Sequence, residues 1–249
     1  MDGWIVLFIF AAVAAAAAIV SLFYYLEKKR TEAMGVAAKR LGFSFSAGPE
    51  PGLLDGLRSF RLFSQGRSRK IRNVLRRQVD DIQITLFDYR FTTSGGKHNR
   101  THDQTVGLFE TVRLEVPSFV LRPEHVFHRL AGALGYQDID FEQDPAFSEA
   151  VLLQGRDEDH IRSLFDRNLL AYFARHPGVC TEGEGPRLVF YRQERRVDPA
   201  QLEGFVEEGL DVLSAMLEAG GDTGIAPWLE LSPATVPPPQ EEPETAWRD

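Results

Sequence analysis

The chain is poor in cysteine: Cys180 is the only one among its 249 residues. A lone cysteine cannot form a disulfide within the chain, and this suits a protein in a reducing compartment. The one base close to it in the sequence is His176, and we interpret Cys180 as a small buried residue rather than a nucleophile.

Catalytic motifs are also lacking. The chain has no Gly-x-Ser-x-Gly, His-Glu-x-x-His or Cys-x-x-Cys sequence, which excludes common signatures of serine hydrolases, zinc proteases and thiol redox enzymes. We therefore favour a protein that is not an enzyme and that has no catalytic residues, no cofactor and no metal. The alternative is an unrecognised hydrolase, for which Asp88, His98, His102 and Asp103 are the polar candidates.

No Lys or Arg precedes the long apolar run at residues 4–26. A cleaved signal peptide has a basic leader and a shorter apolar region, so we do not interpret this run as one. Its 23 residues would form roughly 35 Å of helix, against a hydrocarbon core of about 30 Å, and this predicts one transmembrane helix.

The charges beside this run predict its direction. Lys28, Lys29 and Arg30 follow it at once, and the positive-inside rule places that side in the cytoplasm. We therefore predict a single-pass protein of the inner (plasma) membrane, with residues 1–3 outside and the C-terminal domain in the cytoplasm. An uncleaved anchor with its domain outside is the alternative.

Small residues recur at four-residue spacing in the apolar run, at Ala11 and Ala15 and at Ala14 and Ala18. This spacing lets two helix backbones approach closely, so it is compatible with self-association of the anchors. The alternative is that an alanine-rich run produces such spacings by chance.

Composition divides the rest of the chain into a helical juxtamembrane stalk (27–42), a strand-rich basic half (43–145), an acidic half (146–231) and a disordered tail rich in Pro and Glu (232–249). Residues 27–130 hold 19 Lys and Arg against 11 Asp and Glu, whereas residues 131–249 hold 9 against 24. A basic surface beside a cytoplasmic leaflet would attract anionic lipid. The alternative is that positive-inside residues and an acidic tail produce the asymmetry by themselves.

Periodic patterns predict an α+β fold in which helices pack on an antiparallel sheet. Residues 71–78 and 82–92 are typical of a β-hairpin, and both faces of the second strand are apolar, so we expect it to be covered on both sides. We predict a polar loop at 93–103 and a returning strand at 104–114.

The following part of the chain is predicted to be helical at residues 123–134. The acidic half then has the order strand, helix, helix, strand, strand, helix. Asp157, Asp166 and Asp198 stand where helix N-caps are expected.

Three segments, Leu86–Phe91, Arg100–Val106 and Gly135–Phe141, resemble an uncharacterised group of bacterial single-pass membrane-anchored proteins. Leu153–Gly155, followed by paired helices and a hairpin, is similar to the same group. The resemblance covers residues 41–217. It implies the membrane location and the fold, and it implies no activity.

Basic side chains gather in two places, at residues 67–77 and in the predicted loop 93–103. We expect seven of them to form an anion or lipid site through charge-assisted hydrogen bonds. They are Arg69, Lys70, Arg72, Lys97, His98, Arg100 and His102. The alternative is a solvated loop. Nucleic acid is not an expected partner, because a membrane tether and an acidic half oppose it.

Two patterns would suit metal ligands, and both have a simpler interpretation. His125 and His128 have the i, i+3 spacing of one helix face, but no third ligand is evident, so we interpret them as packing residues. The alternating carboxylates at 138–144 lack the glycine that a calcium loop needs, so we interpret them as the exposed face of an edge strand.

These features lead to two hypotheses of different classes. The first is a membrane-tethered cytoplasmic interaction module, an adaptor or scaffold that binds another protein. The second is a membrane-surface sensor whose basic half binds anionic lipid or a phosphorylated ligand. The predicted partners are the lipid bilayer and another protein.

Overall fold

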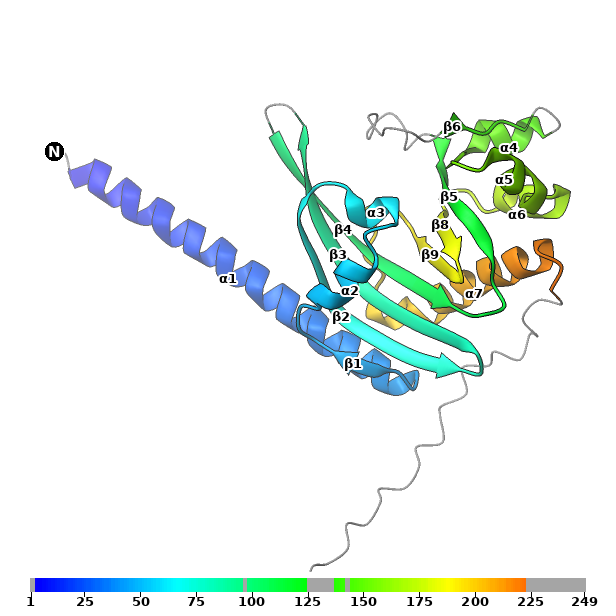
Figure 1. Ribbon diagram of the computed structural model, residues 1–249. Helices are drawn as coiled ribbons and strands as arrows, with labels where there is room; N and C mark the ends of the chain where they lie inside the picture. Colours follow the sequence, from blue (N-terminus) through cyan, green and yellow to red (C-terminus); the bar gives the residue numbers. More distant parts are fainter. Residues whose placement is uncertain (1–2, 96–97, 125–136, 142–143, 223–249) are drawn as a thin grey trace, which may run out of the picture.

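Nine strands of the described chain form one sheet in which every neighbouring pair is antiparallel (Figure 1). They are β1 (Ser44–Ser46), β2 (Arg67–Val79), β3 (Ile82–Gly95), β4 (His98–Glu110), β5 (Val116–Pro123), β6 (Gln137–Asp138), β7 (Val151–Gly155), β8 (Cys180–Gly185) and β9 (Arg187–Tyr191). Their order across the sheet is β1-β2-β3-β4-β9-β8-β5-β7-β6. The structure is a computed structural model that describes residues 3–95, 98–124, 137–141 and 144–222.

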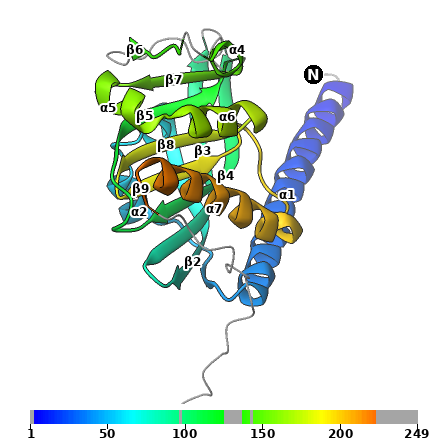
Figure 2. The ribbon, with the colours of Figure 1, turned by 90° about the vertical axis from the view of Figure 1, so that its right-hand side faces the viewer.

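Helices lie on both faces of this sheet. They are α1 (Gly3–Arg40), α2 (Pro51–Gly56), α3 (Arg61–Ser64), α4 (Pro145–Ala150), α5 (Glu158–Leu164), α6 (Arg167–Arg175), the short 3₁₀ helix η2 (Pro199–Gln201) and α7 (Leu202–Ala219). The end of α1 and α7 cover one face, and α2 and α3 cover the other (Figures 1 and 2). The predicted α+β class, with helices packed on an antiparallel sheet, is confirmed.

α1 is one continuous helix with two environments. Its described side chains are all exposed as far as Leu26, and Trp4 is 83% exposed, whereas Met34, Ala37 and Ala38 are buried. The helix is long and apolar enough to cross a membrane, a property that it shares with signal sequences.

The segment 27–42, which we expected to be a helical juxtamembrane stalk, packs on the domain. The helix does continue to Arg40, but Met34 and Ala38 lie in the core instead of on an isolated stalk. Their four-residue spacing puts them, with Leu41, on one side of the helix, and that side meets the sheet.

β2, β3 and β4 form two long hairpins. The turn between β2 and β3 contains only residues 80–81. Successive residues of β3 face opposite sides, so that Leu86 is buried on the α1 side and Phe87 on the α3 side. The predicted hairpin and the two-sided burial of its second strand are confirmed.

The polar loop predicted at residues 93–103 is wrong. β3 and β4 pair with each other outward as far as Gly95 and His98. Thr92 lies opposite Thr101 in this extension, and such β-branched residues suit a strand even when it is polar. Arg100 and His102 therefore lie on β4 and not in a flexible loop.

From β7 onward the acidic half has the predicted order, as β7, α5, α6, β8, β9 and α7, but the helix α4 that precedes β7 was not predicted. Asp157 and Asp166 are N-caps as predicted, and each accepts a hydrogen bond from the backbone N–H three residues on, at 3.1 and 2.8 Å. Asp198 accepts from the N–H of Ala200 at 2.9 Å and caps η2, which leads into α7. β8 and β9 join this half to β4 and β5, so both halves of the chain share one sheet.

Several predictions fall on parts of the chain outside the described residues. They concern the helix at 123–134 beyond Glu124, the His125 and His128 pair, Glu142 and the tail at 232–249.

Two glycines of α7 have different surroundings, although they share one helix. A Cβ atom on Gly209 would lie 2.4 Å from Cζ of Phe109 and 3.2 Å from Cδ1 of Phe190. A Cβ atom on Gly204 would have nothing within 4 Å. Gly209 therefore lets α7 approach the sheet closely, and Gly204 has no such role.

We predict that Gly209→Ala and Gly204→Ala change stability in opposite directions. Alanine at 209 would displace the Phe109 ring and should lower the free energy of unfolding by about 1–3 kcal/mol. Alanine at 204 should raise it by up to about 1 kcal/mol, because Ala favours a helix more than Gly does. Thermal unfolding followed by circular dichroism measures both effects. Equal changes would contradict the close packing of α7.

Candidate functional site

An arginine of α1 is held by a carboxylate in the middle of the sheet. Asp88 lies on β3, opposite Thr105 of β4. Arg30 donates from Nε to Oδ2 of Asp88 at 2.8 Å and from Nη2 to Oδ1 at 2.7 Å, while its Nη1 donates to the Val197 carbonyl at 2.9 Å. The side chains of Arg30 and Asp88 are only 14% and 9% exposed. Water and salt therefore screen this bidentate ion pair only weakly.

Asp88 accepts three further hydrogen bonds. The donors are Nδ2 of Asn73 at 2.9 Å, Oγ1 of Thr105 at 3.1 Å and Nη2 of Arg196 at 3.3 Å. Burial by itself would raise the pKa of Asp88, but the hydrogen bond and charge of Arg30, with the charge of Arg196, outweigh it and hold this pKa below its ordinary value. Asp88 is thus an ionised structural anion at neutral pH.

A β-bulge brings Asn73 to this carboxylate. The register of β2 against β3 shifts between Arg72 and Leu75, and Asn73 has a φ of 51° there. Asparagine tolerates this left-handed conformation better than most residues do.

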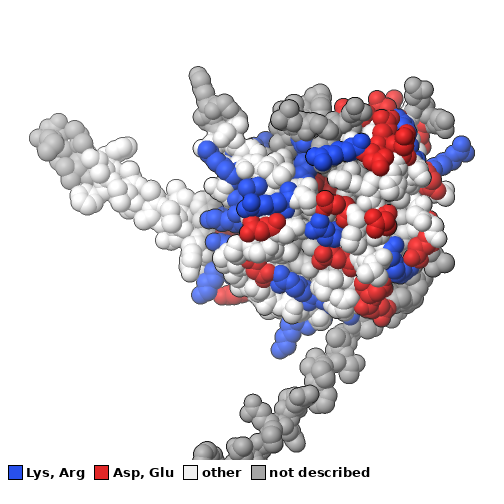
Figure 3. All heavy atoms as spheres, in the orientation of Figure 1, with Lys and Arg blue, Asp and Glu red and all other residues white. Residues whose placement is uncertain are grey.

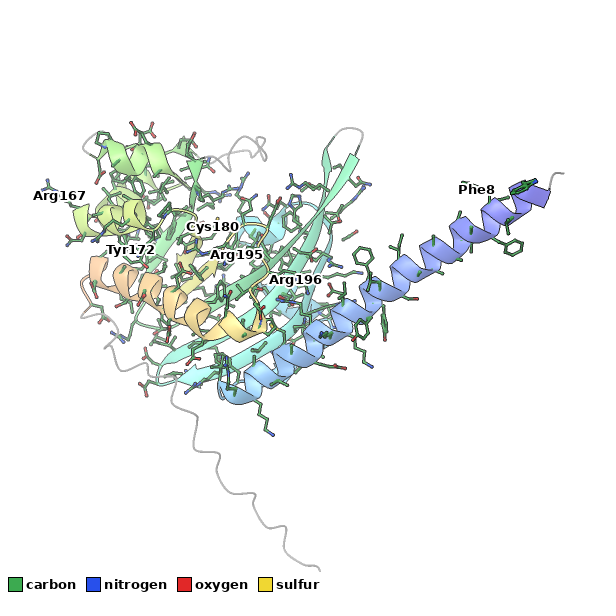
Figure 4. All side chains as sticks on the ribbon, turned by 180° about the vertical axis from the view of Figure 1, so that it is seen from behind. Phe8, Arg167, Tyr172, Cys180, Arg195 and Arg196 are labelled. Carbon is green, nitrogen blue, oxygen red and sulfur yellow. The ribbon has the colours of Figure 1, made fainter. Side chains whose placement is uncertain are left out.

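A second carboxylate, Glu27, lies where α1 first meets the domain. Arg196 donates to its two oxygens at 2.5 and 3.1 Å, and Nη2 of Arg90 lies 3.4 Å from it. Nε of Arg90 also donates to Asp103 at 2.6 Å. The hydrogen bond from Arg196 lowers the pKa of Glu27, against the opposing effect of burial. Arg196 lies shortly before η2, the short helix that packs against α1 (Figure 4).

A pocket of about 210 Å³ opens beside this network, and we call it the α1-root pocket. Its basic lining residues are Lys70, Arg72, Arg90 and Arg196. Lys70 lies opposite Arg90 in the register of β2 and β3, and Arg72 lies opposite Asp88, so all of them share one face of the sheet. Lys70 and Arg72 are exposed, and neither has a hydrogen-bond or ion-pair partner within the described residues.

The seven basic residues expected to form one site lie in different places. Lys70 and Arg72 line the α1-root pocket, while Arg69 donates to the carbonyl of Phe63 at 2.7 Å. Arg100 forms an ion pair with Glu194. Lys97 and the side chain of His98 lie outside the described residues.

His102 is a packing residue on the face opposite the pocket. Its ring stacks on Phe91 with centroids 4.6 Å apart, and its two nitrogens lie 2.7 Å from Thr93 Oγ1 and 2.7 Å from Glu194. Adjacent residues of a strand point to opposite faces, so His102 is separated from Asp103 and from Asp88 by the sheet. These three members of the hydrolase hypothesis are not brought together.

Cys180 is fully buried in β8, as the sequence predicts. Burial raises the pKa of its thiol to about 12, which keeps it protonated and unreactive at neutral pH. His176 lies exposed after α6, with its Nδ1 2.7 Å from the carbonyl of Tyr172.

Sequence reasoning missed Glu182, a fully buried carboxylate of β8. The N–H of Leu62 lies 3.1 and 3.2 Å from its two oxygens, and the Tyr191 hydroxyl donates to Oε1 at 3.2 Å. Burial raises the pKa of Glu182. The signal that could have found it is a carboxylate within the first of the two consecutive strands predicted before the last helix of the acidic half.

Three of the carboxylates considered as calcium ligands, Asp138, Asp140 and Asp144, line a larger pocket of about 700 Å³ at the other end of the sheet. Asp144 is occupied as the N-cap of α4, and Asp138 accepts from Nε2 of Gln154 at 2.5 Å. Arg162 and Arg167 also line this pocket. Within the described ranges, His, Cys, Asp and Glu form no group of three or more that could hold a metal ion.

Comparison of the sequence with models of known protein families finds no match, and none is found among curated protein sequences. Among solved structures, the fold is similar to the crystal structure of the mycobacterial trehalose monomycolate transport factor A, TtfA, with a TM-score of 0.53 and 14% sequence identity. The alignment covers 76% of this chain and 93% of that one. At this level of identity the likeness shows the fold alone.

We predict that Asp88→Asn lowers the free energy of unfolding by about 3 kcal/mol at neutral pH, because it leaves the largely buried Arg30 without its counter-charge. Since the folded-state pKa of Asp88 is depressed, its contribution is complete above the ordinary Asp pKa of about 3.9 and is lost as the pH falls through the depressed value. The native protein should therefore lose stability below about pH 4 more steeply than the variant does.

Thermal unfolding of the full-length protein in neutral detergent, measured between neutral and acidic pH, tests both expectations. Asp55→Asn is the matched control, because Asp55 and its partner Arg58 are both more than half exposed. Similar losses for the two variants would show that the Arg30–Asp88 pair has no special role.

Proposed function

We propose that the protein is a membrane-tethered cytoplasmic interaction module, an adaptor or scaffold that assists another membrane protein. The observation that carries this proposal is that α1 combines a segment suited to cross a membrane with a segment packed in the domain core. One unbroken helix has the length and composition to cross a bilayer, and its last part is built into the core of the domain. A domain attached in this way would be held at a fixed place beside the membrane.

The likeness of fold gives independent support. TtfA is named as a transport factor for trehalose monomycolate, and a shared fold favours an accessory role for this chain without carrying over that cargo. Self-association would add a second copy of the chain as a partner. Ala11, Ala14, Ala15 and Ala18 all lie on the exposed part of α1, where another helix can reach them.

A second function, that of a membrane-surface sensor, is favoured by one specific observation. Lys70 and Arg72 lie at the α1-root pocket without acidic partners in the described structure, and Glu27, at the end of the apolar segment, lines the same pocket. Such cations would meet anionic headgroups if α1 spans the membrane.

We predict that the domain is on the cytoplasmic side. Val112→Cys introduces a thiol at a position that is 89% exposed, and Asp2→Cys introduces one at the other end of the anchor. In intact cells a membrane-impermeant maleimide should label position 2 but not position 112, which should react only after permeabilisation. The buried native thiol of Cys180 provides an unreactive background. Labelling of position 112 in intact cells would reverse the orientation, and a mature chain without its N-terminus would identify a signal sequence.

We predict that a membrane protein co-purifies with the full-length chain after crosslinking in its native membrane, and that its recovery depends on the fixed attachment of α1. Insertion of Gly-Ser-Gly-Ser between Leu26 and Glu27 keeps both anchor and domain but uncouples them, so it should lower recovery of the partner several-fold. The same insertion between Gly220 and Gly221, beyond α7, is the control and should have no effect. Mass spectrometry identifies and counts the partner. A preparation that contains only this chain and lipid would contradict the adaptor function.

A further inference from the structure

The α1-root pocket lies at the level where the exposed part of α1 ends. Glu27, one of its lining residues, is the first described residue of α1 that is not exposed, and it directly follows the apolar run. Lys and Arg side chains gather on the side of the domain from which α1 emerges, whereas Asp and Glu gather around β6 and α4 (Figure 3). The pocket therefore opens near the bilayer surface if α1 spans the membrane.

The charges around this pocket do not balance. Its three carboxylates, Glu27, Asp88 and Asp103, are matched by three arginines, Arg30, Arg90 and Arg196, through the ion pairs described above. Lys70 and Arg72 are left over, and both lie on the pocket side of β2. Two uncompensated cations give the pocket a net attraction for an anion.

Arg196, which lines the pocket, also has a donor atom that the network leaves unused. Nη1 and Nη2 of Arg196 hold Glu27 and Asp88, but its buried Nε has no partner within the described residues. Guanidinium and ammonium groups are the usual ligands of phosphate oxygens. A volume of about 210 Å³ accommodates a phosphate ester, because one water molecule takes up about 30 Å³.

We propose that the α1-root pocket binds the phosphate group of an anionic phospholipid, with Lys70 and Arg72 as its principal ligands. This inference rests on the proposed membrane tether only for the source of the phosphate, since a lipid of the adjacent leaflet is the nearest phosphate ester. It is independent of any protein partner. Phosphate binding would place the domain against the bilayer and make its contact depend on lipid charge.

The test is native mass spectrometry of the full-length protein in neutral detergent, with equal amounts of phosphatidylglycerol and phosphatidylcholine. The first bound lipid should be phosphatidylglycerol, and its binding should weaken as ionic strength rises. The double substitution Lys70→Gln and Arg72→Gln should weaken this binding by about tenfold or more, because each cation near the headgroup contributes separately. Its thermal unfolding should be unchanged, because both side chains are exposed.

The matched control is the double substitution Lys28→Gln and Lys29→Gln, which removes two exposed cations of α1 beside the same membrane surface. It should retain most of the phosphatidylglycerol binding. If both double variants lose binding equally, or if neither does, the pocket is not the site. Displacement of the lipid by an equal concentration of inorganic phosphate would overturn the lipid as ligand and identify a soluble phosphate instead. None of these results depends on co-purification of a protein partner, so the adaptor function can fail independently.

Discussion

The fold depends on one buried ion pair that joins the N-terminal helix to the centre of the sheet. Arg30 and Asp88 are 58 residues apart in the chain, and the same guanidinium also binds the carbonyl of Val197. Burying a charge without partners is strongly unfavourable, but here the arginine and the carboxylate are both hydrogen-bonded at several points. Arg30 can therefore be buried only when β3 and the segment before η2 are both in place.

The burial of Arg30 against the sheet determines how the domain is oriented relative to the exposed part of α1. Because Arg30, Met34 and Ala38 all face the sheet, α1 has no flexible joint between its exposed part and its packed part. The direction of the exposed helix is consequently fixed relative to the pocket at its root. A fragment that begins at Phe43 would lack this helix, expose part of the core and leave Asp88 without its main partner, so it is not equivalent to the domain.

Local patterns were sufficient to predict much of the fold. The alternation of Leu86 and Phe87 predicted a strand covered on both faces, and the caps at Asp157 and Asp166 depend only on residues next to them. The extension of β3 and β4 was missed because its residues are polar on both faces, so no apolar alternation marks it.

The site was harder to predict because it is made by distant segments. Lys28, Lys29 and Arg30 look alike in the sequence, as positive charges that follow an apolar run. Only Arg30 has the four-residue spacing to Met34 and Ala38 that places it on the buried side, and this was the available signal. Lys70 and Arg72 line the same pocket as Arg196, which is more than 100 residues away in the sequence. Their proximity depends on the tertiary fold, and no local sequence pattern encodes it.

The contacts between the two ends of the described chain also bear on its synthesis. Glu27 and Arg30 leave the ribosome early, but their partners Arg196 and Val197 follow 169 and 167 residues later. A nascent chain whose first helix has already entered the bilayer would have to keep Arg30 hydrated until nearly the whole domain has been translated. The last segment made would then close the core over a helix already held in place by the membrane, so a ribosome that stalls before Val197 would leave an inserted chain with an unfinished domain.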